Sequence, residues 1–176
     1  TDCIGWCEGA IEVNAFDERI DGQHLESISL RFDNCRIVAD ADHHPVRRRL
    51  ATFEERVRAL GDRLGCVRIV VERPRDDGFL ELLLGSVDPG IRYALDLRDP
   101  SWDDVEGRLA EAGAVRVGDT TGQAGWAYVR YRELAYDDAE LARIAADLGQ
   151  LDRAGIETYA FFRHGDEPDA SLAALR

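Results

Sequence analysis

Eight short apolar runs follow one another along the chain, and this succession constrains the fold more than any other feature. The runs are Cys3–Trp6, Ala10–Phe16, Cys35–Asp40, Val67–Glu72, Tyr93–Arg98, Ala114–Asp119, Trp126–Arg132 and Glu157–Arg163. Helix-like or loop-like stretches separate them, and repeated strand–crossover–strand order is typical of a parallel sheet. Eight units are the number that closes a (β/α)8 barrel, so the sequence predicts an α/β protein with a compact TIM-like barrel.

The spacing of the runs predicts where this barrel lacks helices. The chain has 176 residues, whereas a barrel usually needs roughly 200 to 250. Only Cys7–Gly9 separates the first two runs, and only Thr120–Gly125 separates the sixth from the seventh. Neither gap can hold a helix. We therefore expect a single domain over residues 1–176, with helices missing after strands 1 and 6.

The other gaps are long enough for helices. The longest are Thr52–Leu64, Asp77–Gly85, Ser101–Ala112 and Asp137–Gly155. Thr52 and Ser101 are placed to cap two of these helices at their N-termini. The tail Asp169–Arg176 reads as the start of a last helix.

Composition limits the classes of partner. The formal net charge is -13, and all 22 basic residues are arginine. This balance disfavours binding to nucleic acid or acidic membranes by bulk charge, and it is typical of a halophile or a GC-rich source. No apolar run has the length of a transmembrane helix, so we expect a cytoplasmic protein without a membrane partner. The absence of methionine suggests a processed chain or a fragment. The sequence indicates neither a cofactor nor an oligomeric state.

Strand parity predicts where charges gather. Residues of a barrel strand alternate between the interior and the helix layer. With the apolar positions facing helices, the inward positions near the strand ends are mostly charged or polar. They are Glu12 and Asn14 in the second run, Arg68 and Glu72 in the fourth, Asp96 and Arg98 in the fifth, and Arg130 and Arg132 in the seventh. Because the carboxyl ends of barrel strands share one mouth, we expect these side chains to meet there.

The first candidate site consists of five of these residues, Glu12, Asn14, Asp96, Arg98 and Arg130. Arg98 and Arg130 are predicted to hold an anion by bidentate hydrogen bonds. Glu12 and Asp96 would form a general acid/base pair, oriented by Asn14. The alternative is a structural ion network of the same charged residues, filling a narrow barrel in a protein without catalytic activity.

Two further candidates lie elsewhere. Arg130, Arg132, Arg163 and His164 on strands 7 and 8 suit a phosphate, which TIM barrels often bind there. Alternatively, Arg132 and Arg163 pair with surface acids. A third possibility is a metal-dependent phosphoesterase whose ligands are Asp40, Asp42, His43 and His44. The alternative for these four residues is an exposed polar loop.

Several segments together resemble one known family. Tyr93–Trp102 is similar to the pattern A-x-E-x-R-H-x-S-W, Trp126–Arg132 to Y-V-R-L, Ile11–Asn14 to V-E-I-N, Cys3–Trp6 to T-S-G-W, Leu64–Val67 to L-G-x-V, and Phe161–His164 to a last-strand motif. In this order they resemble the YecE-like family, domain-of-unknown-function family 72, whose members look like TIM barrels. The resemblance implies a barrel but supplies no reaction.

The chain also departs from the family pattern. Asp40 stands where a lysine is common, Val70 at a usual glutamine, Asp96 at a glutamate and Asp99 at a histidine. The sequence therefore predicts a barrel that binds or processes a small anionic, phosphate-bearing ligand at its C-terminal mouth. The non-catalytic and metal-dependent alternatives stay open.

Overall fold

The computed structural model describes residues 11–12, 19–20, 23–24, 26–32, 45–133 and 135–162, with the side chains of residues 47–162 other than 49, 63 and 134. The chain divides into two compact units, Thr1–Ala114 and Val115–Arg176, and each is described by itself. The predicted strands Cys3–Trp6 and Cys35–Asp40 and the last helix Asp169–Arg176 lie outside the described residues.

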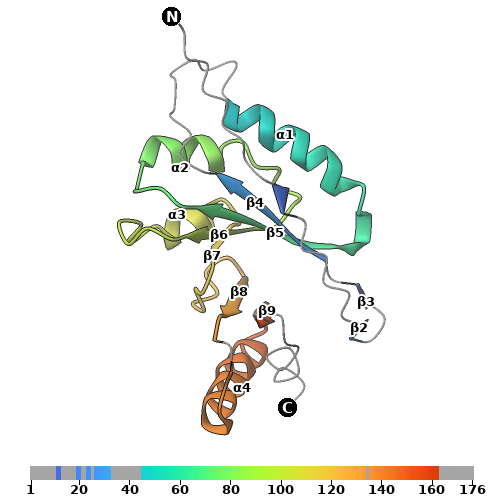
Figure 1. The fold of residues 1–176 in the computed structure, drawn as a ribbon, viewed down its shortest axis with the longest axis vertical. Coiled ribbons are helices and arrows are strands. Elements are labelled where there is room, and N and C mark those ends of the chain that lie inside the picture. The colour runs from blue at the N-terminus through green and yellow to red at the C-terminus, as the bar shows by residue number, and fades with distance from the viewer. Residues whose placement is uncertain are drawn as a thin grey trace, which may run out of the picture. The chain divides into compact units, whose positions relative to one another are not determined.

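The N-terminal unit is built on a mostly parallel sheet (Figure 1). Its strands, in spatial order, are β1 (Ile11–Glu12), β4 (Glu26–Phe32), β5 (Leu64–Val71) and β6 (Tyr93–Leu97). β4, β5 and β6 are parallel to one another, whereas β1 is antiparallel to β4, with Glu12 opposite Ser29. A separate small hairpin joins β2 (Arg19–Ile20) and β3 (Gln23–His24).

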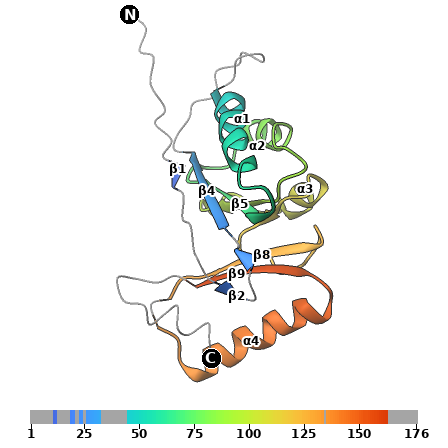
Figure 2. The same ribbon diagram turned by 90° about the vertical axis from the view of Figure 1, so that its right-hand side faces the viewer.

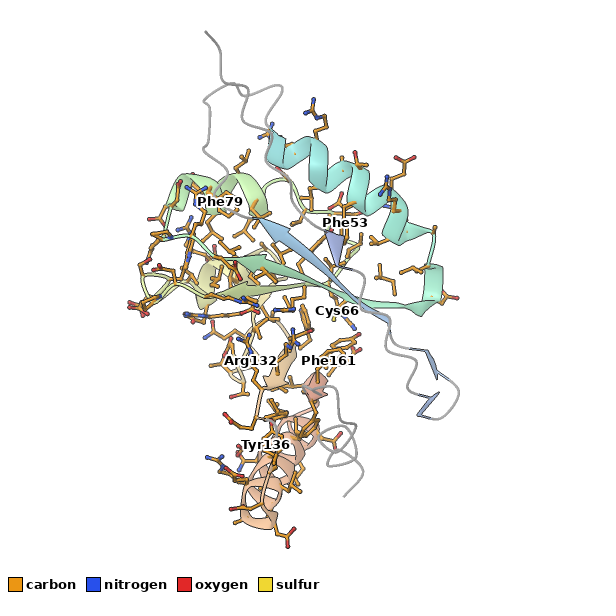
Figure 3. All side chains as sticks on the ribbon, in the orientation of Figure 1. Phe53, Cys66, Phe79, Arg132, Tyr136 and Phe161 are labelled. Carbon is orange, nitrogen blue, oxygen red and sulfur yellow. The ribbon has the colours of Figure 1, made fainter. Side chains whose placement is uncertain are left out.

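Three helices cover one face of this sheet (Figure 2). They are α1 (Pro45–Arg58), α2 (Asp77–Leu84) and α3 (Glu106–Glu111); a 3-10 turn, Gly61–Arg63, precedes β5. The core contains alternate residues of β5 and β6, namely Val67, Ile69, Val71, Tyr93, Leu95 and Leu97. Phe53 of α1 and Phe79 of α2 lie over these side chains (Figure 3). The parity predicted for the apolar positions of β6 is confirmed.

Two predicted helix starts are wrong. α1 begins at Pro45, well before Thr52, because proline suits the first turn of a helix. Thr52 lies inside this helix, and its hydroxyl donates to the Arg48 carbonyl at 2.9 Å. α3 begins only at Glu106, after Val105, and Ser101 belongs to the preceding loop. In contrast, α2 and the helix of the C-terminal unit lie where they were predicted.

The amino-terminal strand pattern differs from the expectation. Within the predicted run Ala10–Phe16 the structure describes Ile11–Glu12, which form β1, and β1 is antiparallel where the barrel requires a parallel strand. β4 was not predicted as a strand at all. Its apolar residues Ile28, Leu30 and Phe32 alternate with polar ones, which is the pattern of a strand with one polar face.

The C-terminal unit contains a parallel strand pair and one long helix. Its elements are β7 (Val115–Arg116), β8 (Trp126–Tyr131), α4 (Asp138–Arg153) and β9 (Glu157–Phe162). β8 and β9 are parallel, with Arg130 opposite Phe161. A capping box starts α4: the Asp137 side chain accepts from the Glu140 amide, and the Glu140 side chain accepts from the Asp137 amide. As predicted, residues 120–125 contain no helix.

Together these elements define a mixed α/β protein with parallel strands. The described strands form open sheets, so closure into a barrel is not observed in this part of the chain. Among the described helices, none is both long and apolar enough to cross a membrane.

Candidate functional site

The carboxyl ends of β5 and β6 place charged side chains together. Within the parallel pair, Val70 lies opposite Asp96 and Arg68 lies opposite Ala94. The face that carries Arg68 and Asp96 is opposite to the one covered by helices. Arg68 and Asp96 are only 3% and 5% exposed. The Arg68 Nε donates to Asp96 Oδ2 at 3.1 Å, and its Nη2 donates to the same oxygen. This is a buried ion pair.

The buried pair continues outward through two more charges. The Arg98 amide donates to the Val71 carbonyl at 3.0 Å, which extends the pairing of β5 and β6 beyond the end of β6. The Arg98 Nε lies 3.6 Å from Asp96 Oδ2, and its Nη1 forms an ion pair with Glu72. The side chains of Arg98 and Glu72 are 36% and 35% exposed. We call Arg68, Asp96, Arg98 and Glu72 the ion chain, because their charges alternate from the buried end to the solvent.

The loops after β5 and β6 are tied to each other beside the ion chain. The Trp102 indole Nε1 donates to the Arg73 carbonyl at 2.7 Å, and the Arg75 amide donates to the Ser101 hydroxyl at 2.7 Å. Arg75 Nη1 also donates to the Asp103 carbonyl at 2.7 Å. Trp102 is fully buried in the core. These contacts explain the last two residues of the Tyr93–Trp102 motif: Ser101 joins the two loops, and Trp102 anchors them in the core.

The outer rim of this edge is also balanced in charge. The Arg75 Nη2 lies 3.1 Å from Asp77 Oδ1, and Arg108 Nη1 forms a second ion pair with the same carboxylate. The hydrogen bonds from Arg75 and then Arg108 hold the pKa of Asp77 below its ordinary value. The hydroxyl and amide of Ser101 lower the pKa of Asp99 in the same way. The carboxylates of the rim are therefore stabilised in their charged forms.

The structure brings some of the predicted site residues together. Asp96 and Arg98 are neighbours in the ion chain, and they are joined by Arg68 and Glu72, which the sequence placed inward without assigning them to the site. Which carboxylate each arginine pairs with depends on the register between the strands, and the sequence does not indicate that register. The alternation of inward and outward residues along the strands was the signal that could have assigned Arg68 and Glu72 to the site.

Other predicted residues are not placed in this cluster. Glu12 lies in β1, but its side chain is outside the described part of the chain. Arg130 is in β8 of the C-terminal unit, and Arg132 is an exposed residue just after that strand. Asn14, Arg163 and His164 lie outside the described residues, as do the metal-ligand candidates Asp40, Asp42, His43 and His44. Among the residues that the structure does describe, no group of three or more His, Cys, Asp and Glu side chains could hold a metal ion.

The fold and the ion chain define an α/β protein with charged groups at the carboxyl ends of parallel strands. Comparison with protein families matches residues 34–176 to the family described as Protein of unknown function DUF72. The match covers most of the chain, so the protein belongs to this family, as the resemblance to the YecE-like proteins implied. Neither the comparison with curated proteins nor the comparison with solved structures finds a match.

Proposed function

We propose that the exposed end of the ion chain binds a small anionic ligand, such as a phosphate-bearing compound, through Arg98. One observation carries this proposal: the partly exposed Arg98 guanidinium is held in position between Asp96 and Glu72 where two parallel strands end. Ligands of open parallel sheets bind outside the carboxyl ends of the strands. A planar guanidinium suits a phosphate or carboxylate because it donates two parallel hydrogen bonds.

The four charges would then have different tasks. Asp96 is held by Arg68 on its buried side and is therefore a positioning residue for Arg98. Glu72 occupies the outer part of the Arg98 guanidinium, where an incoming anion would compete with it. Closure of the strands into a TIM-like barrel, the pairing of Asp96 with Glu12 in proton transfer, and cytoplasmic localisation are further parts of the proposal.

The predicted roles of the remaining residues also belong to this proposal. Asn14, Arg130, Arg132, Arg163 and His164 are expected to add contacts to the anion. Each of them is a hypothesis that substitution can test one residue at a time.

A structural role for the ion chain is the second candidate. Two arginines and two carboxylates balance each other, as expected of an ion network that needs no ligand. A network of this kind would lose stability when Glu72 is neutralised and would not respond to anions.

Thermal unfolding in increasing inorganic phosphate, at constant ionic strength, separates the two candidates. We expect phosphate to raise the Tm of the wild type, Arg98→Ala to remove this response, and Glu72→Gln to enlarge it because the competing carboxylate is gone. Arg58→Ala is the matched control, since Arg58 is an exposed arginine paired with Asp88 before the start of β6. The proposal fails if the wild type does not respond, or if Arg98→Ala responds as fully as Arg58→Ala.

A further inference from the structure

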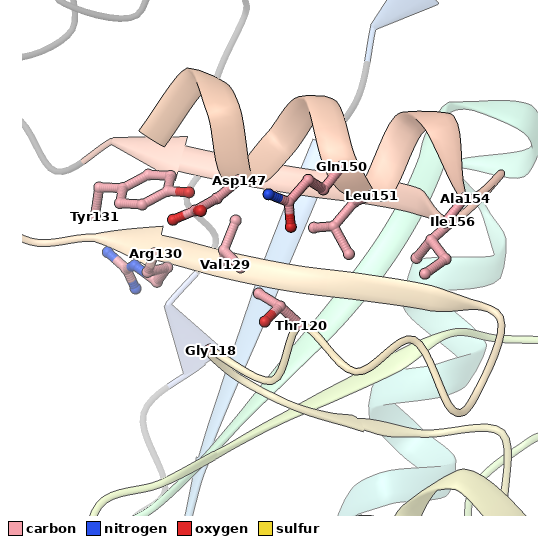
Figure 4. Close-up of a pocket in the computed structure, with 10 residues that line it drawn as sticks. All are labelled: Gly118, Thr120, Val129, Arg130, Tyr131, Asp147, Gln150, Leu151, Ala154 and Ile156. Carbon is pink, nitrogen blue, oxygen red and sulfur yellow. The ribbon is translucent and has the colours of Figure 1, made fainter. Parts of the chain in front are cut away.

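The C-terminal unit contains a cavity that is separate from the ion chain. Its volume is about 530 Å³, within the range of roughly 300 to 1,000 Å³ that is typical of small-molecule sites. Figure 4 shows it between β8 and α4, beside the loop after β7. The cavity is lined by Gly118, Thr120, Val129, Arg130, Tyr131, Asp147, Gln150, Leu151, Ala154 and Ile156.

The cavity lies on a face that a helix would normally cover. Val129 and Tyr131 alternate with Tyr128 and Arg130 along β8, and they point to the side on which α4 lies (Figure 4). In a complete strand–helix–strand unit, the helix before β8 would pack against this side as well. Here residues 117–125 form turns and loop instead. The missing helix therefore accounts for the space beside α4.

The two ends of the cavity differ in polarity. At one end the Tyr131 hydroxyl lies next to the Asp147 carboxylate, with the Gln150 amide beside them; at the other end lie the alkyl side chains of Leu151 and Ile156 (Figure 4). Burial, and then the charge of Asp147, raise the pKa of Tyr131, so its hydroxyl stays neutral. On the side of β8 that faces α4, the polar end thus has a neutral hydroxyl, an amide and one negative charge.

Next to the apolar end, the loop before β8 approaches the Ile156 side chain closely. A Cβ on Gly122 would lie 2.3 Å from Ile156 Cδ1, so the loop can reach this side chain only because position 122 is a glycine. The φ of Gly122 is +69°, which also favours glycine. The loop that replaces the helix is therefore shaped to pack on Ile156.

We propose that this cavity binds a small amphipathic cation, with an ammonium group at Asp147 and Tyr131 and an apolar body against Leu151 and Ile156. An anionic head group would meet the Asp147 carboxylate instead. Arg130 also lines the cavity, but the alternation along β8 places its side chain on the opposite face from Val129 and Tyr131. The formal net charge of -13 adds a general attraction for cations.

Thermal unfolding of the full chain with three six-carbon probes tests the proposal. The probes are hexylammonium, hexanol and hexanoate, each at the same concentration and ionic strength. We expect hexylammonium at ten times its Kd to raise the Tm by roughly 3–6 °C, hexanol to act more weakly and hexanoate to have no effect. Equal responses to hexylammonium and hexanoate would overturn the proposal, as would no response to hexylammonium.

Three variants connect the response to this cavity. Asp147→Asn should remove the preference for hexylammonium over hexanol, whereas Asp152→Asn, which removes an exposed charge of the same helix outside the cavity lining, should keep it. Ala154→Leu should fill part of the apolar end and weaken binding of hexylammonium and hexanol alike. If hexylammonium stabilises Asp147→Asn as much as Asp152→Asn, the cation is not bound at Asp147 and the inference is wrong.

Discussion

Removing Arg68 should test whether the buried part of the ion chain holds the N-terminal unit together. In Arg68→Met a side chain of similar length replaces the guanidinium, and the Asp96 carboxylate, 5% exposed, loses both of its hydrogen bonds from Arg68. Removing one partner of a buried ion pair lowers the free energy of unfolding by about 3–5 kcal/mol. Arg98 Nε remains 3.6 Å from the same carboxylate oxygen. We therefore expect the loss to fall near the lower bound, about 3 kcal/mol.

A double variant that removes both buried charges should behave differently. Arg68→Met with Asp96→Leu removes both buried charges and leaves apolar side chains in their place. Such replacements are often neutral or stabilising, so the double variant should be more stable than Arg68→Met. The side chains of the outer pair of the ion chain are about one third exposed, and Arg98→Met should therefore cost only about 0–1 kcal/mol.

Urea unfolding followed by circular dichroism and tryptophan fluorescence measures these differences. Trp102 lies in the core of the N-terminal unit and reports on its packing. Two results would contradict these expectations: an equal loss of free energy of unfolding in Arg68→Met and Arg98→Met, or a double variant less stable than Arg68→Met. Either result would mean that the desolvated Asp96 charge is not the main cause of the stability lost in Arg68→Met.

Three further predictions concern other parts of the chain. Asp137→Ala removes the capping box of α4 and should lower the free energy of unfolding by about 1 kcal/mol in urea. Gly122→Ala should cost roughly 1–3 kcal/mol, because its Cβ would clash with Ile156 at a positive φ; an unchanged Tm would contradict this. The hydrogen bond from Arg58 lowers the pKa of Asp88, so this ion pair contributes stability above about pH 4 and loses it as the pH falls. The deficit of Arg58→Ala relative to the wild type should therefore shrink between pH 5 and pH 2 in pH-dependent urea titrations.

Among the strands of the N-terminal unit, the two that could be predicted are those buried on both faces. β5 and β6 stand out as continuous apolar runs, and the charged residues on their inner face revealed the parity. β4 escaped prediction because its polar positions interrupt the apolar ones, and a search for continuous runs passes over such a strand. Pro45 was the available signal for the true start of α1.

For the site, only the face of the sheet on which its residues lie could be predicted. Alternation placed Arg68, Glu72, Asp96 and Arg98 on one side of the sheet, but it did not say which acid each arginine binds. That choice depends on the register that sets Val70 beside Asp96. The cavity of the C-terminal unit could not be read from the sequence at all, because it arises from packing between α4 and a short loop.

The hydrogen bonds between the loops after β5 and β6 should restrain the motion of this edge of the sheet. The Arg75 amide donates to Ser101 although Arg75 itself is exposed, so its exchange with deuterium should be slower than that of an ordinary loop amide. Trp102 fastens the same loops from the core side. An edge held in this way keeps its arginines oriented before any ligand arrives, and binding there would require little loss of conformational entropy.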